Sequence, residues 1–369
     1  MALSKITTAS LADDSVTGAK IENNPTIAGN LTVSGGFNSS TTTSGKNIII
    51  NGAMKVHQRV ATLTHNDKAV DRFALVKNNL DTADFTTRHY VAGEAEIREF
   101  GGDSLEIKCT TADTNIGANE LIYVRQSIEA QYLRRLSFGT ANAKTTTISF
   151  WVYSNVTGTY AFTLVTQDGT ARNIGGTYTI NSANTWEKKT ITFVGDASAT
   201  INNDNGHGVD VCWILSAGSN WTGTSNTSWA NYAGGRLAHG HNVNIASAIN
   251  KYWYLTGVQW EEGPVATEFE QETYDVTLQK CQRYYEEGYV GFGANFTHAT
   301  HYQFHQHGFN TPKRSDDSYT MTLTEESNYS ITNFNSTYRR DFSGIGIVVY
   351  GAAGYGRYLA SFKCEDDVV

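Results

Sequence analysis

The chain has 369 residues, of which 17% are charged, 34 are Gly and only 3 are Pro, and its formal net charge is -8. This acidic balance argues against a nucleic acid as partner, because phosphate binding depends on clustered Lys and Arg. No apolar run is long enough to span a membrane, and the first residues lack the apolar core of a signal peptide, so we expect a soluble protein made in a cytoplasm. Abundant Thr, Asn and Gly with 20 Tyr, 16 Phe and 7 Trp predict an all-β fold, since these residues suit strands and tight turns.

Residues 1–45 differ from the rest of the chain. They contain no Trp or Tyr, and Phe37 is their single Phe. A segment with so little apolar mass cannot close a core of its own and orders only by association with other copies. The segment is therefore either a thin fibrous shaft in an oligomer or a flexible tail.

Residues 46–271 carry many short alternating runs separated by Gly and Asn turns. Ile148, Phe150 and Val152 recur at every second position, as the inward-facing residues of a half-buried strand do. This spacing predicts a jelly-roll-like β-sandwich. Further runs of this kind are Tyr160–Val165, Thr190–Val194, Val209–Leu215 and Tyr252–Trp260.

A long stretch rich in Gly, Asn, Ser and Thr interrupts these runs between Ser216 and Ile249. A loop of this length in a compact domain is usually functional or disordered. It contains Trp221, Trp229 and Tyr232, whose rings could stack on sugar faces while neighbouring polar side chains bind hydroxyls. The alternative is that the rings pack down and anchor the loop on the sandwich, because Trp is usually well buried.

The spacing of Tyr274, Leu278, Cys281 and Tyr285 predicts one helix, over residues 272–287, which Gly288 ends. We expect this helix to link the sandwich to a second β domain over residues 289–369. That domain offers its own candidate sugar-binding rings, and we favour it over the loop as the receptor site. These candidates are Tyr329, Phe334, Tyr338, Tyr355 and Tyr358.

Histidines are concentrated near the start of the second β domain. His305 and His307 flank one residue, so on a strand both would lie on the same face. Three such pairs at the axis of a trimer would offer six imidazoles, enough for an octahedral Fe or another divalent metal. The alternative is a polar strand face without metal. His239 and His241 have the same spacing inside the Gly-rich loop.

Two patterns suggest hydrolysis, and neither has the right context. Gly102–Leu105 spells the signature of a serine esterase family, and Asp204 with His207 spells its acid–base pair. However, Ser104 leads into an alternating strand and not into a helix. Adjacent acids on a strand point to opposite faces, so they cannot flank one glycosidic bond, and we interpret them as solvated charges. These acid pairs are Glu261–Glu262, Glu286–Glu287 and Glu325–Glu326.

Several segments resemble a family of tail fibre and other virion-associated proteins of tailed bacteriophages. They occur in order between about residues 47 and 287, and their joint occurrence is far more specific than any one of them. The matching stretches are Asn51–Arg59 (NGAMKVHQR), Val70–Phe73 (VDRF), Tyr123–Ile128 (YVRQSI), Ile148–Val152 (ISFWV), Trp186–Phe193 (WEKKTITF), Leu255–Glu270 (LTGVQWEEGPVATEFE) and Cys281–Glu286 (CQRYYE).

The resemblance implies a carbohydrate-binding-like jelly roll over residues 46–271, a linking helix over 272–288 and a variable β tip over 289–369. It also implies a homotrimer that is joined to other tail proteins through residues 1–45. Such a protein is synthesised in the host bacterial cytoplasm, becomes part of the virion and contacts a host surface polysaccharide or lipopolysaccharide. No catalytic residue carries over, so we expect a structural tail fibre subunit without catalysis.

Two alternatives remain open. One is a polysaccharide-degrading or deacetylating tailspike, which would shorten the glycan or release acetate. The other is a purely structural tail connector, which would bind no sugar at all.

Overall fold

The structure is a computed structural model that describes the backbone of residues 45–59, 68–296, 302–315, 319–327, 331–341, 344–351 and 354–366. Beyond residue 284, side chains are described for residues 285–291, 293, 307–315 and 359–366. Residues 1–44 of the predicted shaft lie outside the described part of the chain.

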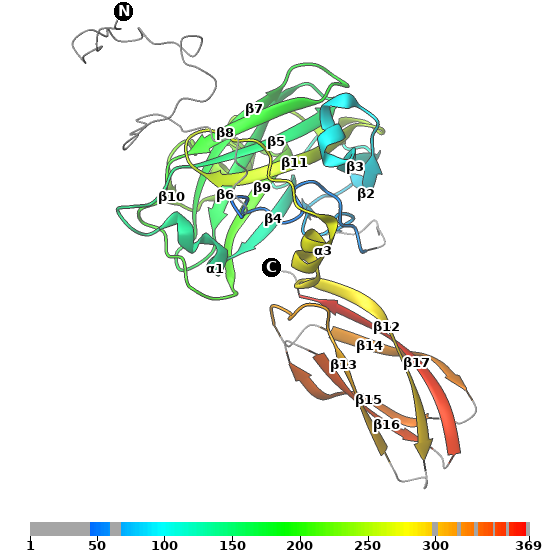
Figure 1. The fold of residues 1–369 in the computed structure, drawn as a ribbon. Helices are drawn as coiled ribbons and strands as arrows, with labels where there is room; N and C mark the ends of the chain where they lie inside the picture. Colours follow the sequence, from blue (N-terminus) through cyan, green and yellow to red (C-terminus); the bar gives the residue numbers. More distant parts are fainter. Residues whose placement is uncertain are drawn as a thin grey trace, which may run out of the picture. The chain divides into compact units, whose positions relative to one another are not determined.

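Two antiparallel sheets face each other and form a β-sandwich (Figure 1). One sheet has the strand order β1-β4-β9-β6-β7-β10, and the other has the order β2-β3-β11-β5-β8. Strands that pair are often far apart in the sequence, as in a jelly roll. The predicted all-β, jelly-roll-like sandwich is therefore confirmed. Its strands are β1 (Ala74–Asn78), β2 (Asp84–Val91), β3 (Asp103–Thr111), β4 (Leu121–Glu129), β5 (Thr146–Ser154), β6 (Gly158–Thr166), β7 (Arg172–Ile180), β8 (Glu187–Phe193), β9 (His207–Ala217), β10 (Ala230–Asn231) and β11 (Tyr252–Glu262).

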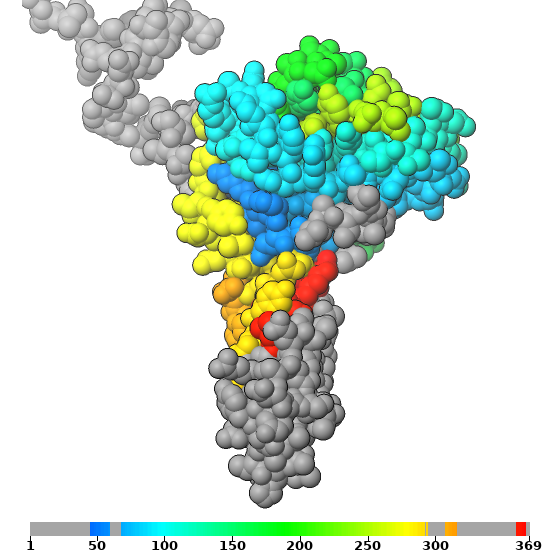
Figure 2. All heavy atoms as spheres, turned by 90° about the vertical axis from the view of Figure 1, so that its right-hand side faces the viewer, coloured from blue at the N-terminus to red at the C-terminus, as the bar shows by residue number. Residues whose placement is uncertain are grey.

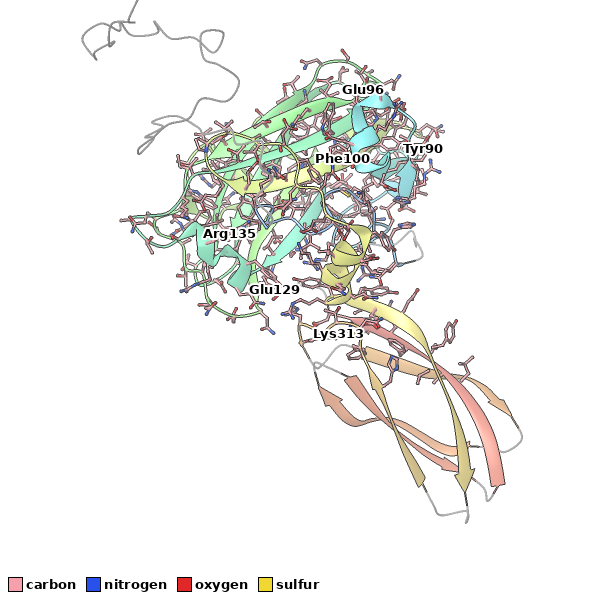
Figure 3. All side chains as sticks on the ribbon, in the orientation of Figure 1. Tyr90, Glu96, Phe100, Glu129, Arg135 and Lys313 are labelled. Carbon is pink, nitrogen blue, oxygen red and sulfur yellow. The ribbon has the colours of Figure 1, made fainter. Side chains whose placement is uncertain are left out.

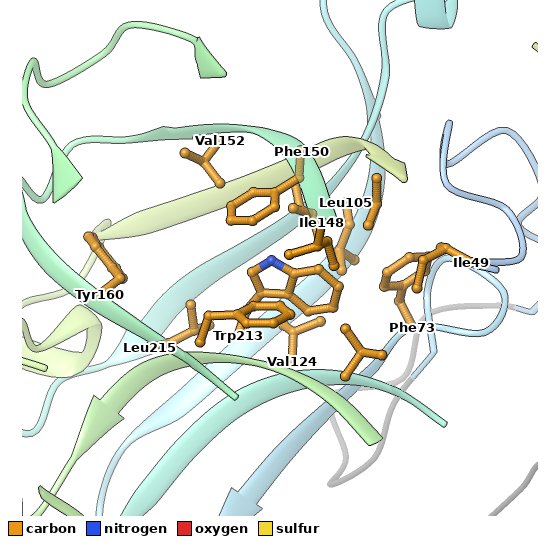
Figure 4. Close-up of a cluster of buried hydrophobic side chains, with 14 of the residues drawn as sticks. Ile49, Phe73, Leu105, Val124, Ile148, Phe150, Val152, Tyr160, Trp213 and Leu215 are labelled. Carbon is orange, nitrogen blue, oxygen red and sulfur yellow. The ribbon is translucent and has the colours of Figure 1, made fainter. Parts of the chain in front are cut away.

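The core between the two sheets is centred on Trp213 of β9, which is fully buried (Figure 4). Its indole packs on the rings of Phe73, Phe150 and Phe162 at centroid distances of 6.1, 5.8 and 5.2 Å. Phe150 comes from the opposite sheet, so these ring contacts join the two layers. Tilted and edge-to-face ring pairs add to the free energy gained from burying the aromatic surface.

Along strand β11 the alternation of inward-facing and outward-facing residues shifts at a bulge. This bulge lies in the stretch Leu255–Glu270, one of the motifs that resemble tail fibre proteins. Trp253 and Leu255 face the core before the bulge, whereas Val258 and Trp260 face it afterwards. The extra residue is Gly257, whose φ of 59° lies in the left-handed region. One type of bulge has a glycine in this conformation, and here a Cβ would also lie 2.5 Å from the Phe100 ring.

Residues 45–59 fasten onto the sandwich before its first strand begins. The side chain of Asn47 takes the place of a strand partner for β11: its Oδ1 accepts from Trp260 N and its Nδ2 donates to Val258 O, both at 3.0 Å. Ile50 packs in a small apolar cluster with Cys281, so this segment also contacts the region of the helix. The two regions are seen as neighbouring blue and yellow surfaces in Figure 2.

Helix α3 (Tyr274–Gln282) is present but shorter than the predicted helix over 272–287. The chain leaves the helix at Arg283, and Tyr285 already begins strand β12. Gly288 lies inside β12 and does not end the helix, so this part of the prediction is wrong.

The apolar residues with helical spacing continue past the end of the helix, and they lie in different environments. Cys281 is fully buried, whereas Tyr274 is 50% exposed. The ring of Tyr285 lies in a β-strand beneath the guanidinium of Arg59, 3.8 Å from ring centroid to Cζ. Tertiary contacts of this kind can override the sequence pattern, and here the spacing of apolar residues predicts the helix correctly only for the first two turns.

The C-terminal strands form two three-stranded sheets of their own, in the orders β12-β17-β14 and β13-β16-β15. Strands β12 and β17 pair without a register shift from Tyr285↔Glu365 to Phe296↔Gly354. These strands are β12 (Tyr285–Phe296), β13 (Tyr302–Gly308), β14 (Tyr319–Ser327), β15 (Ile331–Asp341), β16 (Gly344–Gly351) and β17 (Gly354–Glu365).

Two buried ion pairs lie where the sandwich, α3 and the C-terminal strands meet. Arg283 donates from Nε and Nη2 to the carboxylate of Glu129, at 2.7 and 2.9 Å. Lys313, which is 2% exposed, pairs with Glu286 and also donates to Gln282 O at 2.6 Å. Glu129 and Lys313 are labelled in Figure 3. Buried charges are tolerated only when they are paired in this way.

The interpretation of the acid pairs as solvated charges is therefore wrong for Glu261 and Glu286, which are 3% and 2% exposed. The Glu261 carboxylate accepts hydrogen bonds from Thr267 N and Gln259 Nε2, so it holds the segment after β11 in place. Its neighbour Glu262 is exposed, as the alternation of a strand requires. Within the described residues, no helix is long and apolar enough to cross a membrane.

Replacement of the central ring tests the fold. We expect Trp213→Ala to lower the free energy of unfolding by about 3–5 kcal/mol, because it removes a fully buried ring and leaves a cavity. The matched control is Val194→Ala at a position that is 60% exposed, with an expected change within about 0.5 kcal/mol. Chemical denaturation of both variants measures the difference, and equal stability of the two would contradict this account of the core.

Candidate functional site

The long loop over residues 216–249 folds back over the outer face of the six-stranded sheet. Leu237 and Ala238 of the loop pack with Ala161, Val165 and other outward-facing residues of that sheet in a second, smaller apolar cluster. As a result, nearly all of β9 is buried on both of its faces. The loop leaves part of the outer face of this sheet uncovered.

Arg236 fixes the loop in place. Its guanidinium is buried and donates from Nε to Asn173 Oδ1 at 3.0 Å, and from Nη1 and Nη2 to the carbonyls of Ser225 and Ser228, both at 2.5 Å. Asn226 adds a bond from its Nδ2 to Arg236 O at 2.7 Å. A buried Arg with several carbonyl acceptors is satisfied only in one arrangement of the loop, so these bonds hold its backbone.

The two Trp candidates act as anchors. Trp221 donates from Nε1 to Asn119 O at 3.0 Å and packs against the apolar cluster beneath the loop. Trp229 donates to Val194 O at 2.7 Å, and its ring meets Phe138 edge-on at 5.8 Å. Both rings are partly buried. Of the two alternatives for these Trp side chains, the structure favours anchoring.

Tyr232, the third loop candidate, is 43% exposed and lines a cavity of about 240 Å³. The cavity lies between the outer face of the sheet and the loop. Its floor comes from β4, β6 and β9, and Tyr232 and Leu237 of the loop close one side. The loop is held beside the sheet at this point by a bond from Tyr232 N to Ala171 O at 2.8 Å.

The cavity changes from apolar to polar along the strands. On β4 the lining passes from Leu121 through Tyr123 to Arg125, and on the antiparallel neighbour β9 it passes from Ile214 to Asp210. Alternate residues of a strand are about 6.6 Å apart, so the change takes place over roughly 13 Å. The cavity therefore has one end for apolar groups and one for hydrogen-bonding groups.

Asp210 is the acceptor at the polar end. Gln167 Nε2 and His207 Nε2 each lie 2.8 Å from its carboxylate oxygens, and Ser127 Oγ also donates to it. Burial acts to raise the pKa of Asp210, but the His207 hydrogen bond, the charges of His207 and Arg125 and the Ser127 hydrogen bond outweigh it. The net pKa is lowered, so the carboxylate is held ionised.

Arg125 supplies donors for a ligand. Its Nη1 lies 3.6 Å from Asp210 Oδ2, which is an ion pair but not a hydrogen bond. The two tyrosines keep their protons: burial raises the pKa of both Tyr123 and Tyr232, and the nearby Cys212 and Asp210 raise it further. Each phenol is therefore a donor as well as an acceptor at neutral pH.

Sequence reasoning found Tyr232 but missed the rest of the cavity. Tyr123 and Arg125 belong to the YVRQSI stretch, where they alternate with inward-facing apolar residues. Their outward position on a strand was the available signal. Nothing in the sequence indicated that β9, with Asp210, lies next to this strand.

The candidates in the C-terminal strands are placed only by their backbone. Phe334 and Tyr338 lie on β15, and Tyr355 and Tyr358 lie on β17, with their side chains outside the described part. Tyr329 lies outside the described residues altogether. Their role in sugar binding stays a prediction.

Of the paired histidines on β13, the side chain of His305 lies outside the described part. The ring of His307 packs on Phe362 at 4.7 Å and on Phe309 at 6.5 Å, so it contacts aromatic rings of its own chain. Among the described residues no cluster of three or more His, Cys, Asp and Glu could hold a metal ion. A metal ion bound by His305 and His307 stays a prediction.

His241 is a partly buried loop histidine that accepts a hydrogen bond from Ala161 N at Nδ1, 3.1 Å away. Its neighbour in the motif, His239, is partly buried. Burial lowers the pKa of His241 to about 4. The ring is therefore neutral at physiological pH and serves as an acceptor that pins the loop to β6.

The residues of the esterase-like pattern are engaged elsewhere. Ser104 lies within β3, is fully buried, and donates to Tyr90 O at 3.0 Å. His207 begins β9 in the other sheet and pairs with Asp210, whereas Asp204 is exposed. As predicted, Ser104 is a strand residue and does not lie on a turn before a helix.

The neutral His241 makes loop attachment sensitive to acid. An unfolded His has a pKa of about 6.5, whereas the pKa of His241 in the folded chain is about 4. Between these two pH values the unfolded chain binds a proton at this position and the folded chain does not. We expect this residue to reduce the free energy of unfolding by up to about 1.4 kcal/mol per pH unit as the pH falls through this window. His241→Asn keeps an acceptor for Ala161 N and removes the titration, so its unfolding curves should have a shallower pH dependence. An unchanged dependence would contradict the prediction.

No protein-family model matches the chain, and no curated protein matches its sequence. Solved structures similar to it include the enzymatically active domain of tailspike protein 4 of bacteriophage CBA120, at 11% identity and a TM-score of 0.33. That match covers 59% of this chain but only 22% of the tailspike chain. Two others are a family 4 carbohydrate-binding module (13% identity, TM-score 0.30, covering 58% of this chain and 98% of that one) and the family 11 module of a cellulosomal cellulase from Clostridium thermocellum (12% identity, TM-score 0.29, covering 57% and 98%). These descriptions belong to the matched proteins, and the chemistry of this chain rests on its own residues.

Proposed function

We propose that the chain is a structural subunit of a bacteriophage tail fibre that binds a host surface polysaccharide or lipopolysaccharide. The ordered motifs between about residues 47 and 287, which resemble those of tail fibre proteins, support the virion role. In this proposal the subunit is a homotrimer in the virion, and residues 1–45 join it to other tail proteins.

One observation carries the sugar-binding part of the proposal: the cavity on the outer face of the six-stranded sheet. Tyr123 and Tyr232 offer aromatic surface that can pack on the C–H face of a sugar ring. Arg125, Gln167 and Asp210 offer the donors and the acceptor that hydroxyl groups need. The internal bonds of Asp210 and the loop bonds of Arg236 hold this arrangement before a ligand arrives, so little ordering entropy remains to be lost on binding.

We also propose that the subunit has no catalytic activity. The buried position of Ser104 supports this, because its hydroxyl is bonded to Tyr90 O and cannot reach a polysaccharide. Incubation of the purified protein with host polysaccharide should leave chain length and acetyl content unchanged. Release of acetate or shortening of the chains would identify a tailspike enzyme instead.

The loop tyrosine tests the binding site. We expect Tyr232→Ala to weaken binding to purified host polysaccharide by about tenfold or more, because it removes the exposed ring from the cavity. Tyr232→Phe keeps the ring and should retain most of the affinity. The control is Tyr289→Ala, at a position on β12 that is 69% exposed and far from the cavity in sequence. Unchanged binding by Tyr232→Ala in a surface-binding assay would exclude this cavity as the site.

The His305 and His307 pair gives a separate prediction for the assembled protein. If three pairs bind Fe or another divalent metal at a trimer axis, metal analysis of the purified oligomer should find about one ion per trimer. Less than this would exclude the metal site and leave the rest of the proposal intact.

A further inference from the structure

The two ends of the cavity select between classes of sugar. Most ring substituents of an ordinary hexose are hydroxyl groups, which need hydrogen-bonding partners when they leave water. Among the side chains that line the cavity, the partners of this kind are Arg125, Gln167 and Asp210 at one end, together with the phenols of Tyr123 and Tyr232. A hydroxyl group placed at the opposite end would lose its bonds to water without replacement.

The apolar end is formed by Leu121, Ile214 and Leu237. Leu121 and Ile214 are fully buried, whereas Leu237 of the loop is 8% exposed, so of the three only Leu237 keeps surface that a ligand could contact. Leu237 N bonds to Gly234 O at 3.0 Å, and the next residue, Ala238, donates to Trp221 O at 2.9 Å. Because the backbone on both sides is bonded, the Leu237 side chain is held at this end of the cavity.

The size of the cavity limits the ligand to about one sugar residue. Its volume of about 240 Å³ lies below the range of roughly 300–1,000 Å³ that accommodates drug-sized molecules. The roughly 13 Å between Leu121 and Arg125 fits one ring with one substituent along the strands. A long unbranched chain of hydroxylated sugars would need a groove with polar groups at both ends.

We infer that the cavity takes a sugar residue that carries a methyl-bearing substituent, either a 6-deoxy carbon or an acetyl group. In this orientation the methyl group contacts Leu237, and the ring hydroxyls bind Arg125, Gln167 and Asp210. The inference rests on the proposed function and narrows it, because it names the class of sugar for the same site.

Matched sugar pairs that differ by one group test the inference directly. The probes are L-fucose against L-galactose, and N-acetylglucosamine against N-formylglucosamine, each titrated into the full-length protein with saturation-transfer NMR as the readout. For at least one pair the methyl-bearing member should bind about fourfold more tightly, the effect of burying one methyl group. If the methyl-bearing member binds no more tightly than its counterpart in either pair, the inference is overturned and the proposed function is left standing.

Variants of Leu237 locate the effect. Leu237→Met keeps an apolar side chain of similar volume and should keep the preference. Leu237→Asn replaces the apolar surface by an amide of similar length and should reduce the preference to about one, with thermal unfolding as the check that the loop remains folded. A preference that survives in a folded Leu237→Asn would overturn the proposed orientation. If no probe binds and Tyr232→Ala leaves polysaccharide binding unchanged, both the inference and the proposed site fail.

Discussion

The buried guanidinium of Arg236 is the interaction on which the candidate site depends. Its bonds to Asn173 of the sheet and to the carbonyls of Ser225 and Ser228 determine where the loop over residues 216–249 lies. A loop of this composition has no strong local preference for one conformation, so without these bonds the cost in conformational entropy would be large. Once the loop is fixed, the uncovered part of the sheet becomes a cavity, and the exposed ring of Tyr232 is placed at its side.

The motifs that resemble those of tail fibre proteins are mainly structural. Gly257 allows a bulge in β11, and Arg283 pairs with the buried Glu129. Asn51 bonds to the backbone of Val56 and Asp71. The YVRQSI stretch is different because it supplies Tyr123 and Arg125 to the cavity as well as inward-facing core residues. The motifs therefore lie mainly in the framework of the sandwich, while most residues that line the cavity belong to no motif.

The strands could be predicted from sequence because their burial alternates with period two, as in Ile148, Phe150 and Val152 of β5. The end of helix α3 could not, because Tyr285 leaves the helical periodicity to lie beneath Arg59, a contact between residues more than 200 positions apart. Most of the site could not be predicted for the same reason, because its residues meet only through contacts between distant parts of the sequence. Tyr232 was identified as an aromatic residue in a polar loop, but its neighbours Arg125 and Asp210 come together only through the pairing of β4 with β9. The two Trp residues of the loop carry the same composition signal as Tyr232, and only their hydrogen bonds to backbone carbonyls and their packing distinguish them from the exposed ring of Tyr232.

The cavity brings together residues of β4, β6, β9 and the loop within one copy of the chain. If the chain assembles as proposed, each copy would carry its own cavity, and several cavities would contact the same glycan surface. Small cavities that hold one sugar bind weakly, but copies held together convert each later contact into an intramolecular event at high effective concentration. In the proposed tail fibre, avidity of this kind would make attachment of the whole particle far stronger than the binding of one sugar residue by one cavity.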